Sequence, residues 1–216
     1  MSSPTDPALW DQRFSAADYV YGTEPNDFLF EQAAGIPPGR VLCLAEGEGR
    51  NAVFLARRGH PVTAVDFSRE AQRKATALAA HHGVTLAYQL ADLGDYEPEP
   101  EAFSAVVSIF CHLPPAVRRT VHARAARALA PGGLLILEAY SPAQLSRATG
   151  GPKDPTLLVP KDALVAELAE TACLELVIAR ELVRDIHEGS LHGGESAVTQ
   201  VVARRPARES STENAP

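Results

Sequence analysis

The stretch CLAEGEGRNAVFLA, residues 43–56, decides the fold of this chain. It begins in an apolar run, turns at two glycines one residue apart, Gly47 and Gly49, and continues into a helical pattern. A strand that enters a tight turn and then a helix is typical of the carboxyl edge of an open α/β sheet, where such folds bind their ligands. Each glycine follows a glutamate, Glu46 or Glu48, so the ligand has to tolerate carboxylates in this turn.

The alternation of short apolar runs with helical stretches continues downstream, which indicates a parallel sheet covered by helices. The predicted strands are Val41–Leu44, Val62–Val65, Thr85–Leu90, Ala105–Ile109 and Leu134–Glu138. The predicted helices between them are residues 51–58, residues 68–81, and a third helix that starts at Pro114 and Pro115 and ends at the PGG of residues 131–133.

The last third of the chain has a different pattern. A helix, Lys161–Ala172, precedes two longer strands, Leu174–Ile186 and Ser196–Arg205. The turn-rich segment HEGSLHGGE (187–195) lies between these strands, which predicts an antiparallel hairpin. The sequence therefore predicts a Rossmann-like, doubly wound α/β fold, a seven-stranded mixed sheet with helices on both faces and a C-terminal hairpin.

Length and composition limit the organisation and the function classes. A chain of 216 residues with 45% hydrophobic content predicts a single domain over residues 1–205, with 1–39 as an N-terminal cap segment and 206–216 as a disordered tail. The formal net charge of -7 and the lack of a basic tract argue against a nucleic-acid partner. Without a signal-peptide pattern or an apolar run of membrane-spanning length, we expect a cytoplasmic protein, monomeric or weakly dimeric, that acts on small molecules.

The glutamates in the glycine turn indicate which charge the ligand carries. Unit charges about 4 Å apart interact by roughly 4 kcal/mol at an effective dielectric near 20, so Glu46 would oppose a pyrophosphate and favour a cation. The dinucleotide fingerprint GxGxxG is also incomplete, because Ala52 stands where its third glycine belongs. S-adenosylmethionine combines a nucleoside with a sulfonium and an ammonium group and has no phosphate, so it fits this turn.

Two strand ends add candidate contacts for the nucleoside. Asp66 ends the second strand, where a carboxylate can accept hydrogen bonds from both ribose hydroxyls, and Phe67 can lie against the adenine. At the end of the third strand Asp92 can accept a bond from the adenine amino group while Leu93 packs on the ring. The alternative for each aspartate is a turn or a helix cap.

With these residues in place, the sequence resembles the class I S-adenosylmethionine-dependent methyltransferases, and within them the small bacterial group related to tellurite-resistance and thiopurine methyltransferases. Their loop often reads LDLGCGxGRN, and here the segment is LCLAEGEGRN, with Gly47, Gly49, Arg50 and Asn51 in matching positions. This sequence departs from the family at Cys43, Ala45 and Glu46. The resemblance implies in-line methyl transfer to a small nucleophile such as a thiol or a metalloid.

The resemblance also implies a cap formed by the N-terminal segment and further site residues on other loops. Arg13, Tyr19 and Tyr21 are candidates to face the reacting methyl group or the methionine carboxylate, unless this segment only packs on the sheet. After the fourth strand, Phe110 and Cys111 are candidates to line the cofactor. His112 is a candidate general base, unless it caps the next helix.

Residues after the fifth strand can wall the substrate. Tyr140 precedes a long Gly- and Pro-rich loop that is typical of a lid, and Arg184, His187 and His192 on the predicted hairpin can reach the same mouth. His187, Glu188 and His192 match no metal-ligand spacing, so we predict solvated loop residues and no metal. Cys43, Cys111 and Cys173 are far apart and are expected to be free thiols.

Two alternatives share the predicted fold. One is a nicotinamide-dependent oxidoreductase, against which the missing third glycine and the acidic turn weigh. The other is a non-catalytic cofactor-binding domain, which the altered residues 43–46 leave open.

Overall fold

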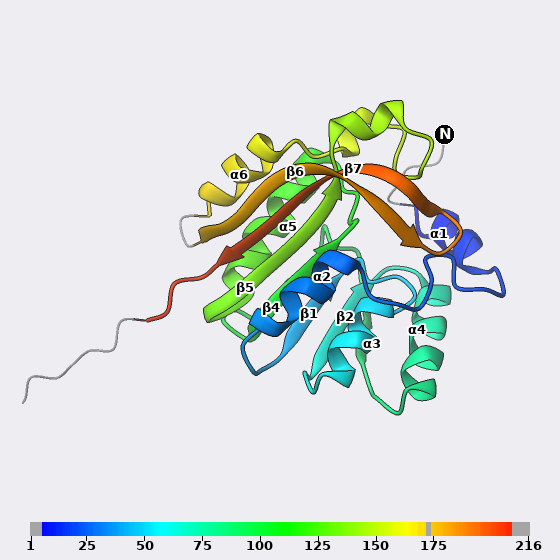
Figure 1. The fold of residues 1–216 in the computed structure, drawn as a ribbon. Helices are drawn as coiled ribbons and strands as arrows, with labels where there is room; N and C mark the ends of the chain where they lie inside the picture. The colour runs from blue at the N-terminus through cyan, green and yellow to red at the C-terminus, as the bar shows by residue number, and fades with distance from the viewer. Residues whose placement is uncertain (1–5, 172–173, 209–216) are drawn as a thin grey trace, which may run out of the picture.

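The computed structural model describes residues 6–171 and 174–208, and within them a seven-stranded sheet forms the centre of the molecule (Figure 1). The strand order is β3-β2-β1-β4-β5-β7-β6, and β7 runs in the direction opposite to the other six strands. The strands are β1 (Val41–Leu44), β2 (Val62–Asp66), β3 (Ala87–Leu90), β4 (Phe103–Ile109), β5 (Leu129–Tyr140), β6 (Glu175–Glu188) and β7 (His192–Arg204). The predicted mixed sheet and its C-terminal hairpin are confirmed.

Helices cover both faces of this sheet (Figure 1). They are α1 (Pro7–Phe14), α2 (Asp27–Gln32), α3 (Arg50–Arg57), α4 (Arg69–His81), α5 (Pro115–Ala128) and α6 (Lys161–Ala169), with short 3-10 turns at Ala33–Gly35, Pro142–Ser146 and Pro155–Leu157. As predicted, Ser68 caps α4 by accepting a hydrogen bond from Ala71 N, and Gly59 follows α3 in the left-handed region, with φ 92°.

Each central strand supplies two cores, because successive side chains point to opposite faces of the sheet. On β1, Leu42 and Leu44 join the cluster that includes Val121 of α5 and Leu164 of α6. Val41 and Cys43 join the opposite cluster, with Phe28 of α2 and Leu55 of α3. All residues of β1, β2 and β4 are buried, which explains why these strands are nearly all apolar.

The hairpin is longer than the sequence predicts. Its strands extend to Glu188 and from His192, so the predicted turn of residues 187–195 shrinks to residues 189–191. The tip of the hairpin is held by a segment that lies 170 residues earlier in the sequence, because Ser190 N donates to Val20 O at 3.0 Å. This contact leaves no pattern in the local sequence, which explains why a loop was the natural prediction.

Smaller differences concern the ends of elements. The predicted third helix ends at Ala128, and β5 begins at Leu129 and includes the PGG segment, with an irregular register against β4. The helix predicted over Lys161–Ala172 ends at Ala169, and Ala172 and Cys173 lie outside the described residues. Of the predicted tail, residues 206–208 are described without regular structure and 209–216 are outside the described range.

Gly49 is required where α3 meets α4. Its φ is 95°, and a Cβ atom there would lie 2.7 Å from Ala75 Cβ, whereas a Cβ on Gly83, with φ 68°, would meet open space. We expect Gly49→Ala to lower the free energy of unfolding by about 2 kcal/mol more than Gly83→Ala, because both carry left-handed strain and only the first adds a clash. Urea unfolding of the two variants checks this, and equal losses would contradict it.

Candidate functional site

A cavity of about 560 Å³ opens at the carboxyl edge of the parallel strands. The loops after β1, β2, β3 and β4 border it, together with α1, the segment after α1, the long loop after β5 and the tip of the hairpin. The predicted site residues that border it are Arg13, Tyr21, Glu46, Gly47, Arg50, Asn51, Asp66, Phe67, Asp92, Leu93, Phe110, Cys111 and His112. Most of the predicted cofactor site is therefore brought together in one place.

Asp66 fixes the glycine turn from the neighbouring strand. Its carboxylate accepts hydrogen bonds from Gly47 N at 3.0 Å and from Ser68 N at 2.9 Å. Tyr88 of β3 donates to Gly47 O at 2.8 Å and holds the turn from the other side. Ala45, with φ 48°, and Gly47, with φ 62°, both lie in the left-handed region. The turn is thus held in one conformation by side chains of two strands.

Glu46 caps helix α3 and borders the cavity at the same time. The residue at the N-cap position, Gly49, has no side chain, and Glu46 Oε1 accepts a hydrogen bond from Ala52 N at 2.7 Å. Burial raises the pKa of the Glu46 carboxyl to about 7, although the bond from Ala52 and the charge of Arg50 lower it. Near neutral pH this carboxyl can therefore change its charge when a ligand arrives.

Glu48, the second acid of the turn, anchors the N-terminal segment. Its carboxylate pairs with Lys74 Nζ at 2.7 Å and accepts hydrogen bonds from Val20 N at 2.8 Å and Tyr21 N at 3.3 Å. Arg13 in turn donates to Tyr21 Oη at 3.0 Å. The predicted cap segment is thereby tied to the glycine turn, and Arg13 and Tyr21 are held at the mouth of the cavity.

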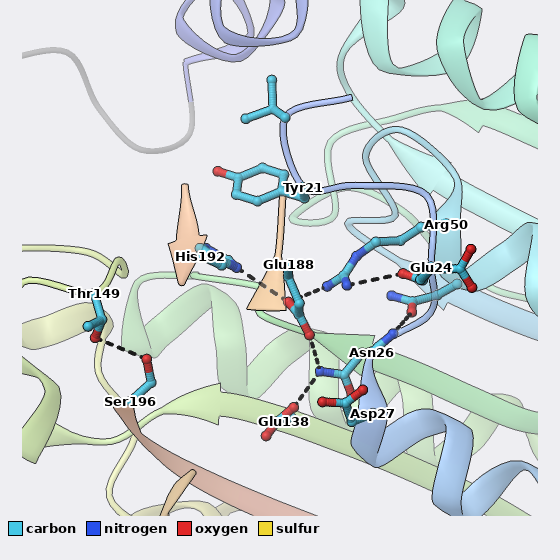
Figure 2. Close-up of polar contacts among 12 residues, drawn as sticks. Tyr21, Glu24, Asn26, Asp27, Arg50, Glu138, Thr149, Glu188, His192 and Ser196 are labelled. Carbon is cyan, nitrogen blue, oxygen red and sulfur yellow. Dashed lines mark hydrogen bonds and ion pairs between the residues drawn. The ribbon is translucent and has the colours of Figure 1, made fainter. Parts of the chain in front are cut away.

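A buried ion network lies below the cap (Figure 2). Asn26 Nδ2 donates to Glu138 Oε2 at 2.6 Å and to Glu188 Oε1 at 2.8 Å. Arg50 Nη2 forms an ion pair with Glu188 at 2.7 Å. Nε and Nη2 of Arg184 donate to Glu138 at 2.8 and 2.9 Å. These bonds join α3, the start of α2, β5 and the hairpin, so they position the hairpin tip against the glycine turn.

Aromatic and imidazole rings form the wall on the hairpin side. Phe110, in the left-handed region with φ 51°, stacks on Tyr140 at 4.6 Å between ring centroids. His192 meets Tyr21 at 4.5 Å and Phe110 at 5.0 Å. His112 stacks on Tyr140 at 5.7 Å. Phe110, His112, His192 and Tyr21 of this wall border the cavity.

Tyr19, Tyr140 and Arg184, the predicted substrate contacts, do not border the cavity. Tyr19 Oη donates to Lys74 O at 3.1 Å outside it. The Tyr140 ring is fully buried and stacks on Phe110, and the Arg184 side chain forms an ion pair with Glu138. Gly49 does not border the cavity either, because it packs against Ala75.

The predicted role of His112 as a base that titrates near neutrality is also corrected. Burial lowers the pKa of His112 to about 3, and its Nδ1 is buried without a partner. His192 and Glu188 are not solvated loop residues either, since both are buried on the hairpin strands and His192 borders the cavity. Of the three hairpin residues expected to reach the mouth, Arg184, His187 and His192, only His192 borders the cavity.

The long loop after β5 forms one side of the cavity, in agreement with its predicted place as a wall. Gly150 to Asp154 and Leu157 border the cavity. Gln144 Nε2 donates to Gly150 O at 3.1 Å, and Thr149 Oγ1 lies 3.0 Å from Ser196 Oγ of β7 (Figure 2). Trp10 and Phe14 of α1 also border it.

Two further features bear on the kind of site. Among residues 6–171 and 174–208, no cluster of three or more His, Cys, Asp or Glu side chains could hold a metal ion. Within the same ranges, no helix has the length and apolar character that crossing a membrane requires.

The residues at the cavity fit S-adenosylmethionine. The volume lies in the range of small-molecule sites, about 300 to 1,000 Å³. Carboxylates border it at the ends of three neighbouring strands, through Glu46, Asp66 and Asp92, while Phe67 and Leu93 supply apolar surface for a nucleobase. Arg13, Arg50 and Lys153 border the same space, and the charge of Arg50 is compensated by Glu188. At the ends of the three strands the acidic side chains thus favour a cationic nucleoside over a pyrophosphate.

Comparisons with known proteins agree with this geometry. The family model described as a methyltransferase domain matches residues 41–133. A 2-heptyl-1-hydroxyquinolin-4(1H)-one methyltransferase from Mycobacteroides abscessus is 29% identical over 127 residues, 57% of this chain and 55% of its own length. The chain thus spans about half the length of this curated relative.

Solved structures share the fold. A protein from a study titled "Conversion of a Disulfide Bond into a Thioacetal Group during Echinomycin Biosynthesis" has a TM-score of 0.76 at 20% identity, over 95% of this chain and 93% of that one. TehB from Haemophilus influenzae has a TM-score of 0.65 at 15% identity, over 92% of this chain and 66% of that one. At these identities the likeness is one of fold alone, and the tellurite-resistance subgroup stays a prediction. Residues 41–133 thus match a methyltransferase domain, and the chain shares its fold with solved structures described as S-adenosylmethionine-dependent methyltransferases.

Proposed function

We propose that this protein transfers a methyl group from S-adenosylmethionine to a small-molecule nucleophile in the cavity. The observation that carries this proposal is the convergence of Glu46, Asp66 and Asp92 on one cavity that also reaches the aromatic wall around His192. One end of the cavity suits a cationic nucleoside, and the other leaves room for an acceptor. Both reactants can therefore meet in a space closed by the cap and the long loop.

Each group of residues has a distinct part in this proposal. Asp66 accepts bonds from the ribose hydroxyls, Phe67 and Leu93 flank the adenine, and Glu46 faces the charged sulfur. Arg13 and Tyr21 close the mouth. S-adenosylmethionine supplies the methyl group as an electrophilic carbon on sulfur. The chain contributes alignment and exclusion of water, which can supply roughly 7 to 11 kcal/mol of the acceleration in well-oriented reactions.

The acceptor is proposed from three chemical classes. The resemblance favours thiols and selenium or tellurium species. The curated relative's name gives a hydroxyquinolone, which adds hydroxylated aromatic compounds. The aromatic side chains of the wall, Tyr21 and Phe110, support an acceptor with apolar surface. We further propose a cytoplasmic protein, monomeric or weakly dimeric, without a nucleic-acid partner, in line with its acidic charge.

The test combines binding and transfer. Calorimetric titration of the purified protein is expected to detect S-adenosylmethionine and S-adenosylhomocysteine and no NADH. Radiolabelled S-adenosylmethionine is then incubated with thiols, selenite, tellurite and hydroxyquinolones, and labelled product is expected from one class. NADH binding without a response to S-adenosylhomocysteine would assign the protein to the oxidoreductases. Cofactor binding without transfer to any class would favour the non-catalytic domain.

A further inference from the structure

His192 is the one imidazole of the wall with a carboxylate partner among the described residues. Its Nδ1 lies 3.5 Å from Glu188 Oε2, and no other polar contact of the ring is formed within the described part of the chain. The ring is buried on one side and borders the cavity on the other. With Nδ1 turned to the carboxylate, the free ring nitrogen is Nε2.

Glu188 is held so that it can orient this ring. Arg50 Nη2 contacts Glu188 Oε2 at 2.7 Å, and Asn26 Nδ2 contacts Oε1 at 2.8 Å (Figure 2). These bonds and the nearby His192 keep the pKa of the Glu188 carboxyl at about 2 despite its burial. A permanent carboxylate beside Nδ1 favours the tautomer with the proton on Nδ1, which leaves a lone pair on Nε2.

The two histidines of the wall, His112 and His192, differ in the charged groups that surround them. His112 has no carboxylate partner, and its Nδ1 is buried without a hydrogen bond. Around His192, Glu188 favours the charged ring, whereas Arg50 and Arg13 oppose it and His112 lies on the same wall. Burial lowers the pKa of His192 as it does that of His112, but of the two rings only His192 has, among the described residues, a carboxylate, Glu188, that stabilises the imidazolium formed when the ring accepts a proton.

We propose that His192 is the catalytic base of methyl transfer, oriented by Glu188, and that the acceptor is a small molecule with a weakly acidic hydroxyl. This assignment rests on the proposed function. The methyl–sulfur bond breaks with its electron pair left on sulfur, and the acceptor oxygen forms the new bond to carbon. The hydroxyl proton passes to Nε2 of His192, and from there to water at the cavity mouth. A thiolate or a metalloid anion would not need this step. His192 therefore assists methyl transfer to hydroxyl acceptors and not to these anions.

The competing role for His192 is packing alone, since its ring also contacts Tyr140 at 5.5 Å. Substitution by glutamine keeps a polar side chain of similar reach and removes the base. His187→Gln is the matched control, because it makes the same substitution on the same hairpin, at a side chain that is 79% exposed and does not border the cavity. Thermal unfolding of both variants verifies that they fold.

The first measurement needs no acceptor. Long-range ¹H–¹⁵N correlation spectra of the protein with S-adenosylhomocysteine identify the tautomer of each histidine, and His192→Gln assigns the signal. We expect His192 at pH 7.5 to be neutral with its proton on Nδ1. A proton on Nε2, or a doubly protonated ring, would overturn the proposal even if the protein proved to be a methyltransferase.

The second measurement compares phenol with 4-nitrophenol, which is far more acidic and ionised in mildly alkaline buffer. At pH 8.5 we expect His192→Gln to lower kcat/KM for phenol by about 100-fold or more, and for 4-nitrophenolate by less than tenfold, because only phenol must lose a proton in the reaction. Equal losses would indicate packing. Transfer to thiols or metalloids with neither phenol methylated would refute the hydroxyl class, whereas failure of wild-type protein to bind S-adenosylmethionine would refute the proposed function itself.

Discussion

Asp66→Ala is expected to weaken the binding of S-adenosylmethionine and S-adenosylhomocysteine by at least tenfold. The substitution removes the carboxylate that we assign to the ribose hydroxyls, and charge-assisted hydrogen bonds of this kind are about twice as strong as neutral ones. It also releases Gly47 N and Ser68 N, which the carboxylate holds at 3.0 and 2.9 Å. The effect therefore combines a lost ligand contact with a loosened turn.

Isothermal titration calorimetry measures this effect, with two comparisons that separate its parts. Asp95→Ala removes the same charge from an exposed position after β3 and is expected to leave the dissociation constants unchanged. Asp66→Asn keeps one oxygen acceptor, so its loss is expected to be smaller than that of Asp66→Ala. An unchanged dissociation constant in Asp66→Ala would mean that the ribose lies elsewhere.

Glu46→Gln is expected to weaken the binding of S-adenosylmethionine about tenfold at pH 8 and that of S-adenosylhomocysteine less than threefold. The two ligands differ in the charge on sulfur, and glutamine keeps an oxygen that can accept the hydrogen bond from Ala52 N. The helix cap is thus preserved while the charge is removed. Glu31→Gln, at an exposed position on α2, is the matched control. Equal losses for both ligands would mean that Glu46 is structural.

The pKa of Glu46 gives the same interaction a pH dependence. The value is raised to about 7 by burial, so the carboxyl is mostly protonated at pH 6 and mostly ionised at pH 8. A cation binds the ionised form more tightly, and the neutral form about tenfold more weakly, so affinity for S-adenosylmethionine is expected to fall about fivefold from pH 8 to pH 6. S-adenosylhomocysteine carries the same amino and carboxyl groups and serves as the reference for their titration. In Glu46→Gln the difference between the two ligands is expected to lose this pH dependence.

The sequence predicted the fold because its evidence is local. Strands buried on both faces, such as Val41–Leu44, read as short apolar runs, and helix ends carried their own markers at Ser68 and Gly59. The grouping of the predicted cofactor residues around one cavity was predictable for the same reason. Most of these residues follow directly on strands β1, β2 and β4, and topology alone brings such positions to one edge.

The hairpin side of the cavity was less predictable, because distant contacts build it. Glu48 fixes residues 20 and 21, Ser190 binds Val20, and Glu188 is joined to Arg50 across 138 residues. Nothing in the segment HEGSLHGGE shows that it is clamped in this way, so a solvated loop was the expectation. The burial of His112, which removes it as a base near neutrality, likewise depends on a wall assembled from several elements.

The central claim is that the cavity holds a sulfonium nucleoside between acidic side chains. A crystal structure of the protein with S-adenosylmethionine tests it most directly. We expect the ribose hydroxyls within hydrogen-bond distance of Asp66, the adenine between Phe67 and Leu93, and Glu46 as the carboxylate nearest to sulfur, with the methyl group directed toward His192. A nucleoside bound outside this cavity, or Glu46 and Asp66 directed away from the ligand, would contradict the account.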